Sequence, residues 1–207
     1  MSELKERSCA EFAAALASAA PVPGGGGAAA LAGALAVSLG AMAARLSAGR
    51  KKTEAEREAL EERIAAADEL GQRLLELIDR DAEGFAPLAR AYALSKEDPQ
   101  RREKLRDASL RACEAPMEML RRCGETAELL TQLRERVSPL LISDLGCAAA
   151  LCRGALESAA MNVWVNTRGL PEDPEARALN EETQQILDRA LPLAGALCAA
   201  VREKLEN

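Results

Sequence analysis

The sequence predicts an all-α protein, a single domain over residues 1–207 built as a bundle of about six helices. Hydrophobic residues make up 48% of the chain but aromatic residues only 2%, so the core must be built from Ala and Leu, whose side chains suit closely packed helices. The β-branched and aromatic residues that favour strands are sparse. No internal repeat and no linker rich in Gly, Pro or Ser divides the chain into separate domains.

Three helices are expected in the first half of the chain. The first covers about residues 8–19, and the second about 25–48, where an Ala- and Leu-rich run follows four glycines. A third helix begins after Thr53, a residue type that caps helices, and glutamates follow it at every second position. This helix continues to about Leu94, and Pro87 inside it predicts a kink because proline cannot donate a backbone hydrogen bond.

Three more helices are expected in the second half. Asp98 and Pro99 are suited to begin the fourth, since Asp caps helices and proline fits the first turn. Prolines inside two of these helices, Pro116 and Pro192, predict kinks in continuing helices rather than helix ends. The expected ranges are about 99–137, 142–166 and 174–205.

The net charge of −6 argues against a nucleic-acid-binding protein. Arginines between residues 101 and 136 alternate with Glu and Asp, which is typical of a solvated helix face rather than a phosphate-binding stripe. Aromatic side chains that could stack on single-stranded bases are also scarce. We therefore expect no nucleic-acid partner.

Histidine is absent from the sequence, which excludes Ser-His and Cys-His nucleophile pairs and every His-ligated metal site. The six cysteines lack the paired C-x-x-C spacing of a zinc site. They indicate buried, reduced thiols, because residues 1–7 lack the basic start of a signal peptide. We expect a cytoplasmic protein that uses no metal.

An uncharged stretch between Glu11 and Arg45 is long enough to be considered as a membrane span. Ala and Gly dominate this stretch, and two prolines interrupt it. A helix that is apolar on all sides is explained more simply as the central helix of a bundle. The sequence therefore predicts no association with a membrane.

The most distinctive stretch runs from Pro21 to Gly27. Its two prolines hold the chain extended, and its four glycines lack Cβ atoms, so their N–H groups can turn towards a ligand. The helix that follows presents uncapped donors and the positive end of its dipole, which suits an anion or the polar edge of a ligand. The alternative is a flexible linker that leads into a buried helix.

Polar residues also mark both ends of the helix expected at 142–166. Asp144, Asn162 and Asn166 fall on one stripe of this helix, with small and apolar residues between them. They could contact a ligand. The alternative is that Asp144 caps the start of the helix and the asparagines close its far end.

Three carboxylates, Asp79, Asp81 and Glu83, lie among apolar residues of the third expected helix. A carboxylate that faces a packed interior has a raised pKa, which suits proton transfer near pH 7. The alternative is a solvated face of the helix.

Four motifs distributed along the chain fit one known family. They are Phe12-x₃-Leu16-Ala17-Ser18-x₂-Pro21-x-Pro23-Gly24-Gly25-Gly26, Gly49-Arg50-Lys51-Lys52, Asp81-x₂-Gly84-Phe85 and Ser143-Asp144…Asn162-Val163-x₂-Asn166. Together they resemble the cyclodeaminase/cyclohydrolase family of folate one-carbon metabolism. The resemblance implies an α-helical homodimer whose substrate is a tetrahydrofolate derivative. Such proteins convert formimino-tetrahydrofolate to methenyl-tetrahydrofolate with release of ammonia, or hydrolyse methenyl- to 10-formyl-tetrahydrofolate.

One residue departs from the family pattern, because Gly27 stands where the family usually has Ser after its three glycines. Of the two reactions, we place the cyclohydrolase first, since the chain has no room for a fused formiminotransferase domain that would supply the formimino substrate. The alternative is a catalytically silent helical module that binds folate or assembles with a partner.

Helix lengths predict which of these residues can meet within one subunit. At 1.5 Å per residue the second helix is about 35 Å long, so Gly24–Gly27 and the lysines after residue 50 lie at opposite ends. An up-down path through the following helices returns Asp81, Asn162 and Asn166 to the glycine end. The same path leaves Asp144 at the lysine end, about 27 Å from Asn162.

The expected site therefore has two parts, and we expect two subunits to share it. Asp81 is the expected acid–base group, with Asp144 as the second catalytic candidate. An Ala/Gly-rich helix with one exposed side would leave an apolar patch, which antiparallel pairing of two copies would bury while joining the two parts. The expected substrate-binding residues are Pro23, Gly24, Gly25, Gly26, Gly27, Lys51, Lys52, Asn162 and Asn166.

Overall fold

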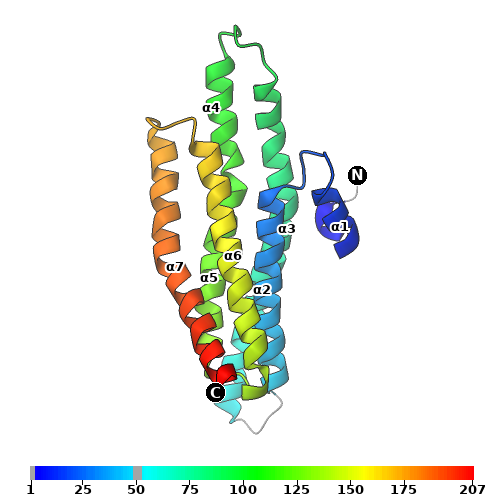
Figure 1. Ribbon diagram of the computed structural model, residues 1–207, viewed down its shortest axis with the longest axis vertical. Coiled ribbons are helices and arrows are strands. Elements are labelled where there is room, and N and C mark those ends of the chain that lie inside the picture. Colours follow the sequence, from blue (N-terminus) through cyan, green and yellow to red (C-terminus); the bar gives the residue numbers. More distant parts are fainter. Residues whose placement is uncertain (1–2, 49–52) are drawn as a thin grey trace.

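Long helices run up and down an elongated bundle in the computed structural model, which describes residues 3–48 and 53–207 (Figure 1). The all-α prediction is confirmed, and the described residues contain no strand. Two short 3₁₀ helices, η1 (Leu4–Glu6) and η2 (Pro139–Leu141), precede α1 and α6. The α-helices are α1 (Cys9–Leu16), α2 (Gly25–Ala48), α3 (Glu54–Tyr92), α4 (Arg101–Ala112), α5 (Glu114–Leu133), α6 (Ile142–Thr167) and α7 (Pro174–Glu206).

Side-chain caps begin several helices where the sequence predicts them. Thr53 accepts a hydrogen bond from the Glu56 N–H at the start of α3, and the side chain of Glu56 returns to the Thr53 N–H. Asp173 accepts from the first turn of α7, with proline at the next position. Asp98 differs from the prediction, because its carboxylate accepts from the Gln100 N–H in a turn and α4 starts only at Arg101.

The continuous helix predicted over 99–137 is wrong, because the chain breaks at Cys113 into α4 and α5. Pro116 explains the break. Its nitrogen cannot donate to the carbonyl of Ala112, and its ring excludes that carbonyl from a helical position. The freed Ala112 oxygen instead accepts a hydrogen bond from Asn166 Nδ2 of α6 at 3.0 Å. Pro87 and Pro192 lie inside the continuing helices α3 and α7, as predicted.

The helix α2 lies inside the bundle, where it packs against α3, α5 and α6. Its small side chains let these neighbours come close. At Gly40, for example, a Cβ would lie only 2.5 Å from Cδ2 of Leu130 in α5. The predicted role of this helix as the centre of the core therefore holds.

Within residues 3–48 and 53–207, two helical stretches have the length and apolar composition of a membrane span. They are α2, 61% buried over its most apolar window, and Pro139–Thr167, only 39% buried there. Burial accounts for the first stretch. The second leaves an apolar side of α6 exposed beside α2.

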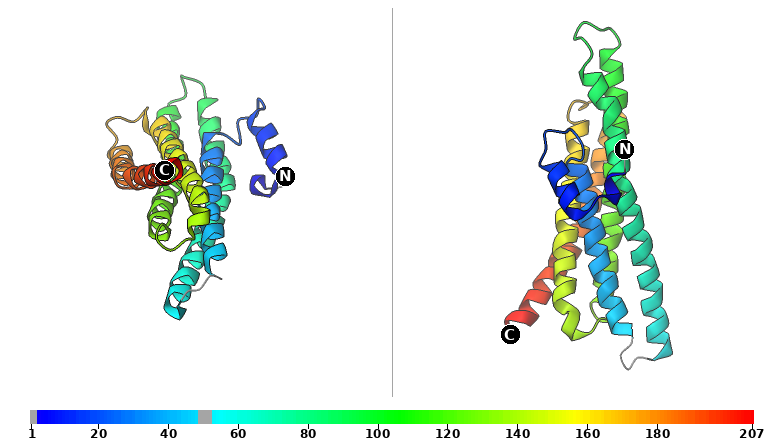
Figure 2. Two further views of the ribbon diagram at one scale, coloured as in Figure 1. Left: turned by 60° about the horizontal axis from the view of Figure 1, so that its bottom comes forward. Right: turned by 90° about the vertical axis from the view of Figure 1, so that its right-hand side faces the viewer.

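The direction of the chain sets the level at which the candidate site residues lie. The 24-residue α2 and the 39-residue α3 are antiparallel neighbours, so α3 continues past the N-terminus of α2. The hairpin of α3 and α4 consequently projects beyond the rest of the bundle (Figure 2). Residues near Gly25 of α2, the middle of α3 and the C-terminal end of α6 share one level, called here the glycine end (Figure 1).

Candidate active site

The turn that leads into α2 brings the backbone of four glycines to the glycine end. Pro23 is buried and follows a cis peptide bond, and the Gly24 carbonyl accepts the first helical hydrogen bond, from the Ala28 N–H at 3.0 Å. Helix N–H groups before that point have no acceptor within their own helix. The start of α2 therefore offers backbone donors and a positive dipole end to whatever lies opposite it.

Asp81 of α3 is the side chain that lies opposite this turn. A Cβ built on Gly26 would be 2.2 Å from Asp81 Oδ1, far inside van der Waals contact, so the carboxyl group occupies the space that any other residue would need. The Gly27 N–H donates a hydrogen bond to the same carboxyl group. A glycine at position 26 is therefore required for Asp81 to rest on the first turn of α2.

This environment changes the acidity of Asp81. Burial raises its pKa to about 6, and the hydrogen bond from Gly27 opposes that rise. A carboxyl group with this pKa can take up and release a proton near neutral pH. Asp81 is half-buried against the glycine turn, whereas Glu83 is exposed.

Asn162 of α6 lies on the other side of the glycine turn. Its Nδ2 is 3.2 Å from the position of a Cβ on Gly25, so the amide lies directly against the start of α2. Nδ2 donates to the Ser158 carbonyl at 2.8 Å. The amide oxygen is therefore the atom of Asn162 left to accept a hydrogen bond from a ligand.

Asn166 lies one turn further along α6 and has a structural contact. Its Nδ2 holds the Ala112 carbonyl at the break between α4 and α5. The sequence interpretation missed this contact, because it joins two residues 54 positions apart. The amide oxygen of Asn166 and its second N–H stay available to a ligand, and its side chain is half-buried.

Asp144 does not join this group within the subunit. Asp144 is the third residue of α6 and lies at the other end of the bundle, about 27 Å from Asn162 along the helix. The N-cap residue of α6 is Leu141, so Asp144 lies in the first turn of the helix and not at its cap position. Lys51 and Lys52 lie outside the described residues.

Three further side chains make contacts at or beside the glycine end that the sequence did not predict. Ile78 and Phe12 approach the Cβ position of Gly27 to 3.8 Å, so they close the turn from α3 and α1. Asp79 receives the Leu4 N–H on its Oδ1 at 2.6 Å and ties the N-terminal segment to α3. The period of the helix predicts Ile78 as a core residue, and its 1% exposure confirms this, but no local pattern marks the contact of Asp79.

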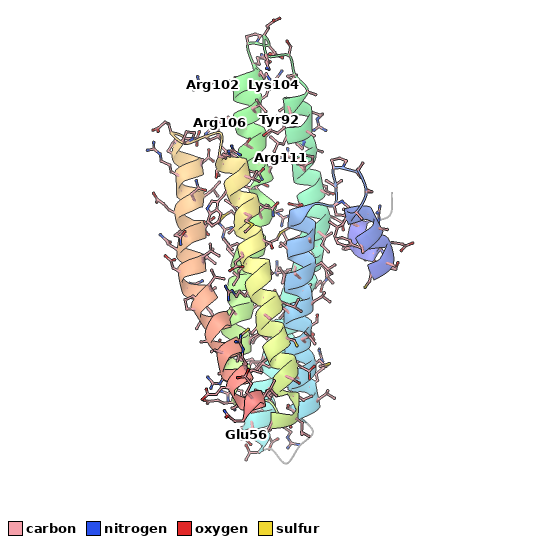
Figure 3. All side chains as sticks on the ribbon, in the orientation of Figure 1. Glu56, Tyr92, Arg102, Lys104, Arg106 and Arg111 are labelled. Atoms are coloured by element: carbon pink, nitrogen blue, oxygen red, sulfur yellow. The ribbon has the colours of Figure 1, made fainter. Side chains whose placement is uncertain are left out.

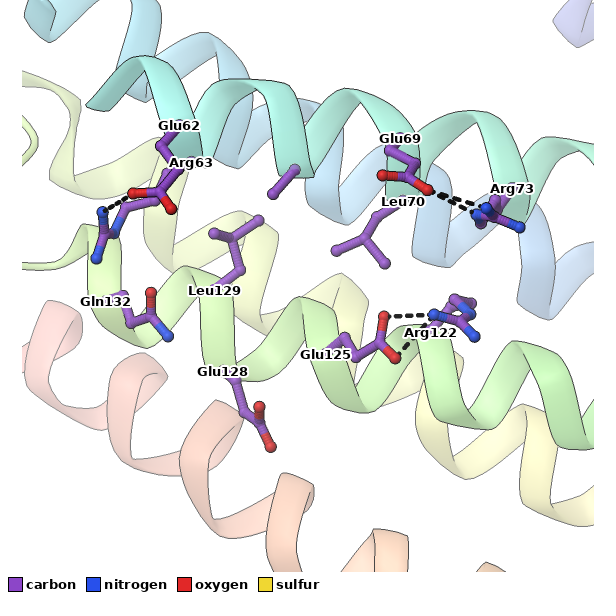
Figure 4. Close-up of a pocket in the computed structure, with 11 residues that line it drawn as sticks. Glu62, Arg63, Glu69, Leu70, Arg73, Arg122, Glu125, Glu128, Leu129 and Gln132 are labelled. Atoms are coloured by element: carbon purple, nitrogen blue, oxygen red, sulfur yellow. Dashed lines mark hydrogen bonds and ion pairs between the residues drawn. The ribbon is translucent and has the colours of Figure 1, made fainter. Parts of the chain in front are cut away.

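A cavity of about 360 Å³ between α3 and α5 does not belong to this site (Figure 4). Its arginines are paired with neighbouring glutamates: Arg73 contacts Glu69 at 2.9 Å, and Arg122 contacts Glu125 at 2.8 Å. Among the described residues no group of three or more Cys, Asp or Glu side chains is arranged to hold a metal ion.

Comparison with known proteins gives one consistent family. The formiminotransferase-cyclodeaminase family matches residues 8–185. A methenyltetrahydrofolate cyclohydrolase of Methylorubrum extorquens is 35% identical over 196 residues, 93% of this chain and 92% of the relative. A formimidoyltransferase-cyclodeaminase of Gallus gallus is 26% identical over 94% of this chain, which spans only 37% of that longer protein. The crystal structure of a formiminotetrahydrofolate cyclodeaminase from Thermotoga maritima superposes with a TM-score of 0.89 at 25% identity, covering 98% of this chain and 100% of that one.

Proposed function

The chain belongs to the formiminotransferase-cyclodeaminase family, and we propose that within it this protein is a methenyltetrahydrofolate cyclohydrolase. It is a folate one-carbon enzyme whose substrate is a tetrahydrofolate derivative. The relative that is 35% identical over most of both chains carries the cyclohydrolase name, and this favours hydrolysis over deamination. The observation that carries the mechanism is Asp81, buried on the glycine turn with a pKa of about 6.

The reaction adds water to the methenyl carbon between N5 and N10 of the substrate. As the water oxygen bonds to that carbon, Asp81 takes one of the water protons. The N5–carbon bond of the tetrahedral intermediate then breaks, and Asp81 returns this proton to N5. The hydroxyl proton of the intermediate leaves as the formyl C=O forms, so the cationic substrate and water yield 10-formyl-tetrahydrofolate and one proton.

The residues around Asp81 are suited to hold the substrate for this step. The free N–H groups at the start of α2 would donate to polar acceptors of the pterin. The amide oxygens of Asn162 and Asn166 would accept from its N–H groups, while one N–H of each Nδ2 holds the side chain on a backbone carbonyl. Pro23 and the glycines Gly24 to Gly27 would form the wall that the ligand contacts.

The deciding experiment is an assay of the purified protein with methenyl-tetrahydrofolate, followed by the loss of its near-ultraviolet absorbance. We expect turnover well above the rate in buffer. No acceleration over buffer would remove the cyclohydrolase proposal. Ammonia release from formimino-tetrahydrofolate tests the cyclodeaminase reaction, which the structural match to the Thermotoga enzyme supports as the second candidate.

Gly27 is the residue that favours a silent folate-binding module instead. A Cβ at this position would lie 3.3 Å from the Pro23 Cβ, so a serine there requires a small adjustment of the turn. If the wild-type protein binds tetrahydrofolate but neither assay detects turnover, while Gly27→Ser gains activity, the silent module is the better description.

We also propose that the protein is a homodimer that pairs through an exposed apolar surface, called here the α2–α6 face. The helices α2 and α6 lie side by side, and their outward sides carry large apolar residues between 37% and 63% exposed. A patch of this kind on a monomer is unusual. The residues are Leu35, Met42, Leu46, Met161, Trp164 and Val165.

A second copy is a better cover for this face than lipid. Arg153 and Glu157 form an ion pair at 3.3 Å in the middle of α6, where a membrane core would exclude charge. Antiparallel pairing across a two-fold axis would bring Asp144, with Lys51 and Lys52, next to the glycine end of the partner. The lysines would then be available to the glutamate carboxylates of the substrate.

Subunit complementation tests the shared site. Chains carrying Asp81→Asn are mixed with chains carrying Asp144→Asn, and subunit exchange is verified. If the active site is shared, each heterodimer has one active site that contains both a wild-type Asp81 and a wild-type Asp144, and that active site should regain turnover. Activity that stays at the level of the parent variants despite exchange would contradict the shared site. A monomer in light scattering would contradict the dimer itself.

The proposal includes a cytoplasmic location and a reaction without metal. Support comes from the thiols: the cysteines are free, and burial raises the pKa of Cys113 and Cys152 to about 12, so they stay protonated and unreactive. Activity that is lost with a chelator and restored by a metal ion would overturn the second part.

A further inference from the structure

The C-terminal end of α4 stands between α3 and α6 at a level that α2 does not reach. The helix α2 packs against both α3 and α6 and separates them along its length. Since α2 begins at Gly25, the stretch just beyond the glycine end needs another spacer. The helix α4 packs against both α3 and α6 and takes that place. Figure 3 shows Arg111, one residue before the end of α4, beside α3 at the base of the hairpin.

Ala112, the last residue of α4, contacts both neighbouring helices. Its Cα lies 3.9 Å from the position of a Cβ on Gly84 of α3. Its carbonyl accepts a hydrogen bond from Asn166 Nδ2 of α6 at 3.0 Å. Cys113 adds a second contact to α6, because its thiol donates to the Val163 carbonyl with the sulfur and the oxygen 3.8 Å apart. The end of α4 therefore rests on α3 and is tied to α6.

These contacts join those of the glycine turn in a closed ring. On α3, Gly84 lies three residues, about 4.5 Å, beyond Asp81. On α6, Asn166 lies four residues, about 6 Å, beyond Asn162. Both helices run in the same direction, so Ala112 contacts them about one turn beyond Asp81 and Asn162. The ring passes from Asp81 through the glycine turn to Asn162 and returns through Asn166, Ala112 and Gly84.

The Ala112 carbonyl depends on Asn166 for its place in this ring. In a continuous helix this carbonyl would accept from the backbone of residue 116, but Pro116 has no N–H. Ala112 is 7% exposed, and a buried carbonyl without a hydrogen bond is destabilising. Loss of the Asn166 N–H should therefore move the end of α4 outwards to water and away from α6.

We propose that Asn166 is a positioning residue, which fixes the separation of Asp81 and Asn162 by holding the end of α4 between their helices. The proposal rests on the proposed function, because this separation matters to turnover only if Asp81 moves the proton while Asn162 holds the substrate. Asn166 then acts on the reaction through Ala112, in addition to any contact that its own amide makes with the substrate.

Asn166→Asp isolates this role. A carboxylate has the size of the amide and keeps an oxygen that can accept from the substrate, but at neutral pH it cannot donate to the Ala112 carbonyl. We expect kcat with methenyl-tetrahydrofolate to fall roughly 10- to 100-fold, because a misplacement of about 1 Å can cost about 10²-fold. KM should stay unchanged, since the accepting oxygen is kept. An unchanged kcat, or a raised KM at unchanged kcat, overturns the proposal.

Asn180→Asp is the matched control. Asn180 of α7 is half-buried like Asn166, and its Oδ1 accepts from Thr167 Oγ1 at 2.8 Å, so it also joins another helix to this end of α6. The substitution adds the same charge but keeps the acceptor, and its contact lies outside the ring. We expect the kcat of wild type. If kcat falls as far as in Asn166→Asp, a general effect of the added charge explains the loss and the proposal is wrong.

An NMR titration of the Asp81 carboxyl carbon gives a readout that does not depend on catalysis. Burial and the Gly27 N–H set the pKa of Asp81, and burial has the larger influence, so displacement of Asp81 from the glycine turn lowers its pKa. Asn166→Ala adds no charge. We expect a midpoint of about 6 in wild type and in Asn180→Ala, and a midpoint lower by roughly half a pH unit or more in Asn166→Ala.

The two measurements separate the positioning role from the proposed reaction. Equal midpoints in wild type and Asn166→Ala overturn the positioning role even if the wild type is an active cyclohydrolase. A midpoint that is lowered in Asn166→Ala, in a protein whose wild type shows no turnover, supports the positioning of Asp81 and counts against the proposed reaction alone.

Discussion

Asp79 and Asp81 lie two residues apart on α3, yet the regions around them use a carboxylate in different ways. Asp79 faces the N-terminal segment and holds the Leu4 N–H on Oδ1 at 2.6 Å. Asp81 faces the glycine turn, where its carboxyl group rests on Gly26 and accepts from Gly27. The same residue type on one helix therefore becomes a tether on one side and an acid–base candidate on the other.

The difference comes from what the neighbouring segment brings to each carboxylate. Asp79 accepts one hydrogen bond, from the Leu4 backbone to Oδ1. The Oδ2 atom of Asp79 is buried without a hydrogen-bond partner in the described part of the chain. Asp81 is opposed by glycines that add no side chain, so its carboxyl group rests directly on the start of α2, and burial raises its pKa to about 6. Variants on the two sides should therefore separate catalysis from stability.

The largest effect is expected for Asp81→Asn. The amide keeps the shape of the side chain but cannot carry the proton, so we expect methenyl-tetrahydrofolate turnover to fall by roughly two to four orders of magnitude. Glu83→Gln, an exposed change on the same helix, is the matched control and should behave like wild type. Near-wild-type turnover of Asp81→Asn would transfer the acid–base role, with Asp144 as the next candidate.

The pH profile sharpens that comparison. Because Asp81 must be ionised to accept a proton from water, kcat/KM of the wild type should rise as pH increases through about 6. The residual activity of Asp81→Asn should lack this inflection. An inflection that persists in the variant would belong to another group.

Gly26→Ala should have the next largest effect. Its Cβ would stand 2.2 Å from Asp81 Oδ1, so the carboxyl group must move by an ångström or more. Misplacement of a reacting group on that scale costs about 10²-fold in kcat/KM, and overpacking costs about 1–3 kcal/mol of unfolding free energy. Kinetics and urea unfolding measure the two. A fully active alanine variant would show that Asp81 acts from another position.

A smaller effect is expected in the pH dependence of stability. The folded-state pKa of Asp81 is raised, so its contribution to the unfolding free energy is complete below about pH 4 and lost as pH rises through about 6. The Asn side chain of Asp81→Asn does not titrate. The unfolding free energy of this variant should therefore increase relative to that of the wild type by about 1 kcal/mol between pH 4 and pH 8, after allowance for solvent screening. Denaturant unfolding at the two pH values measures the gain. A constant difference between the two proteins would contradict the raised pKa.

The smallest effect is expected for Asp79→Asn. An amide oxygen can still accept from the Leu4 N–H, but the bond loses its charge assistance, which costs about 1 kcal/mol of unfolding free energy. Turnover should stay close to that of wild type. A loss of turnover as large as that of Asp81→Asn would contradict the assignment of a structural role to Asp79 and a catalytic role to Asp81.

Much of the bundle could be predicted from local patterns. Thr53 and Asp173 mark the starts of α3 and α7 because their caps involve only neighbouring residues. The regular rise of a helix also brings Asp81 and Asn162 to the level of the glycines. Pro116 predicts only a kink, but the structure shows a break. The outcome depends on whether a group outside the helix can donate to the carbonyl that the proline leaves without its helical N–H partner. Asn166 supplies that group from 54 residues away.

The sequence by itself determined which segments are helical and which end of the bundle holds the glycine turn, because caps, composition and helical rise are local properties. The tertiary structure alone decided that Asp81 meets Gly26, that Asp79 holds the N-terminal segment, and that Asn166 binds the Ala112 carbonyl. These contacts depend on the rotation of each helix about its own axis relative to its neighbours. That rotation is set by close packing across the whole core, which no single stretch of sequence encodes.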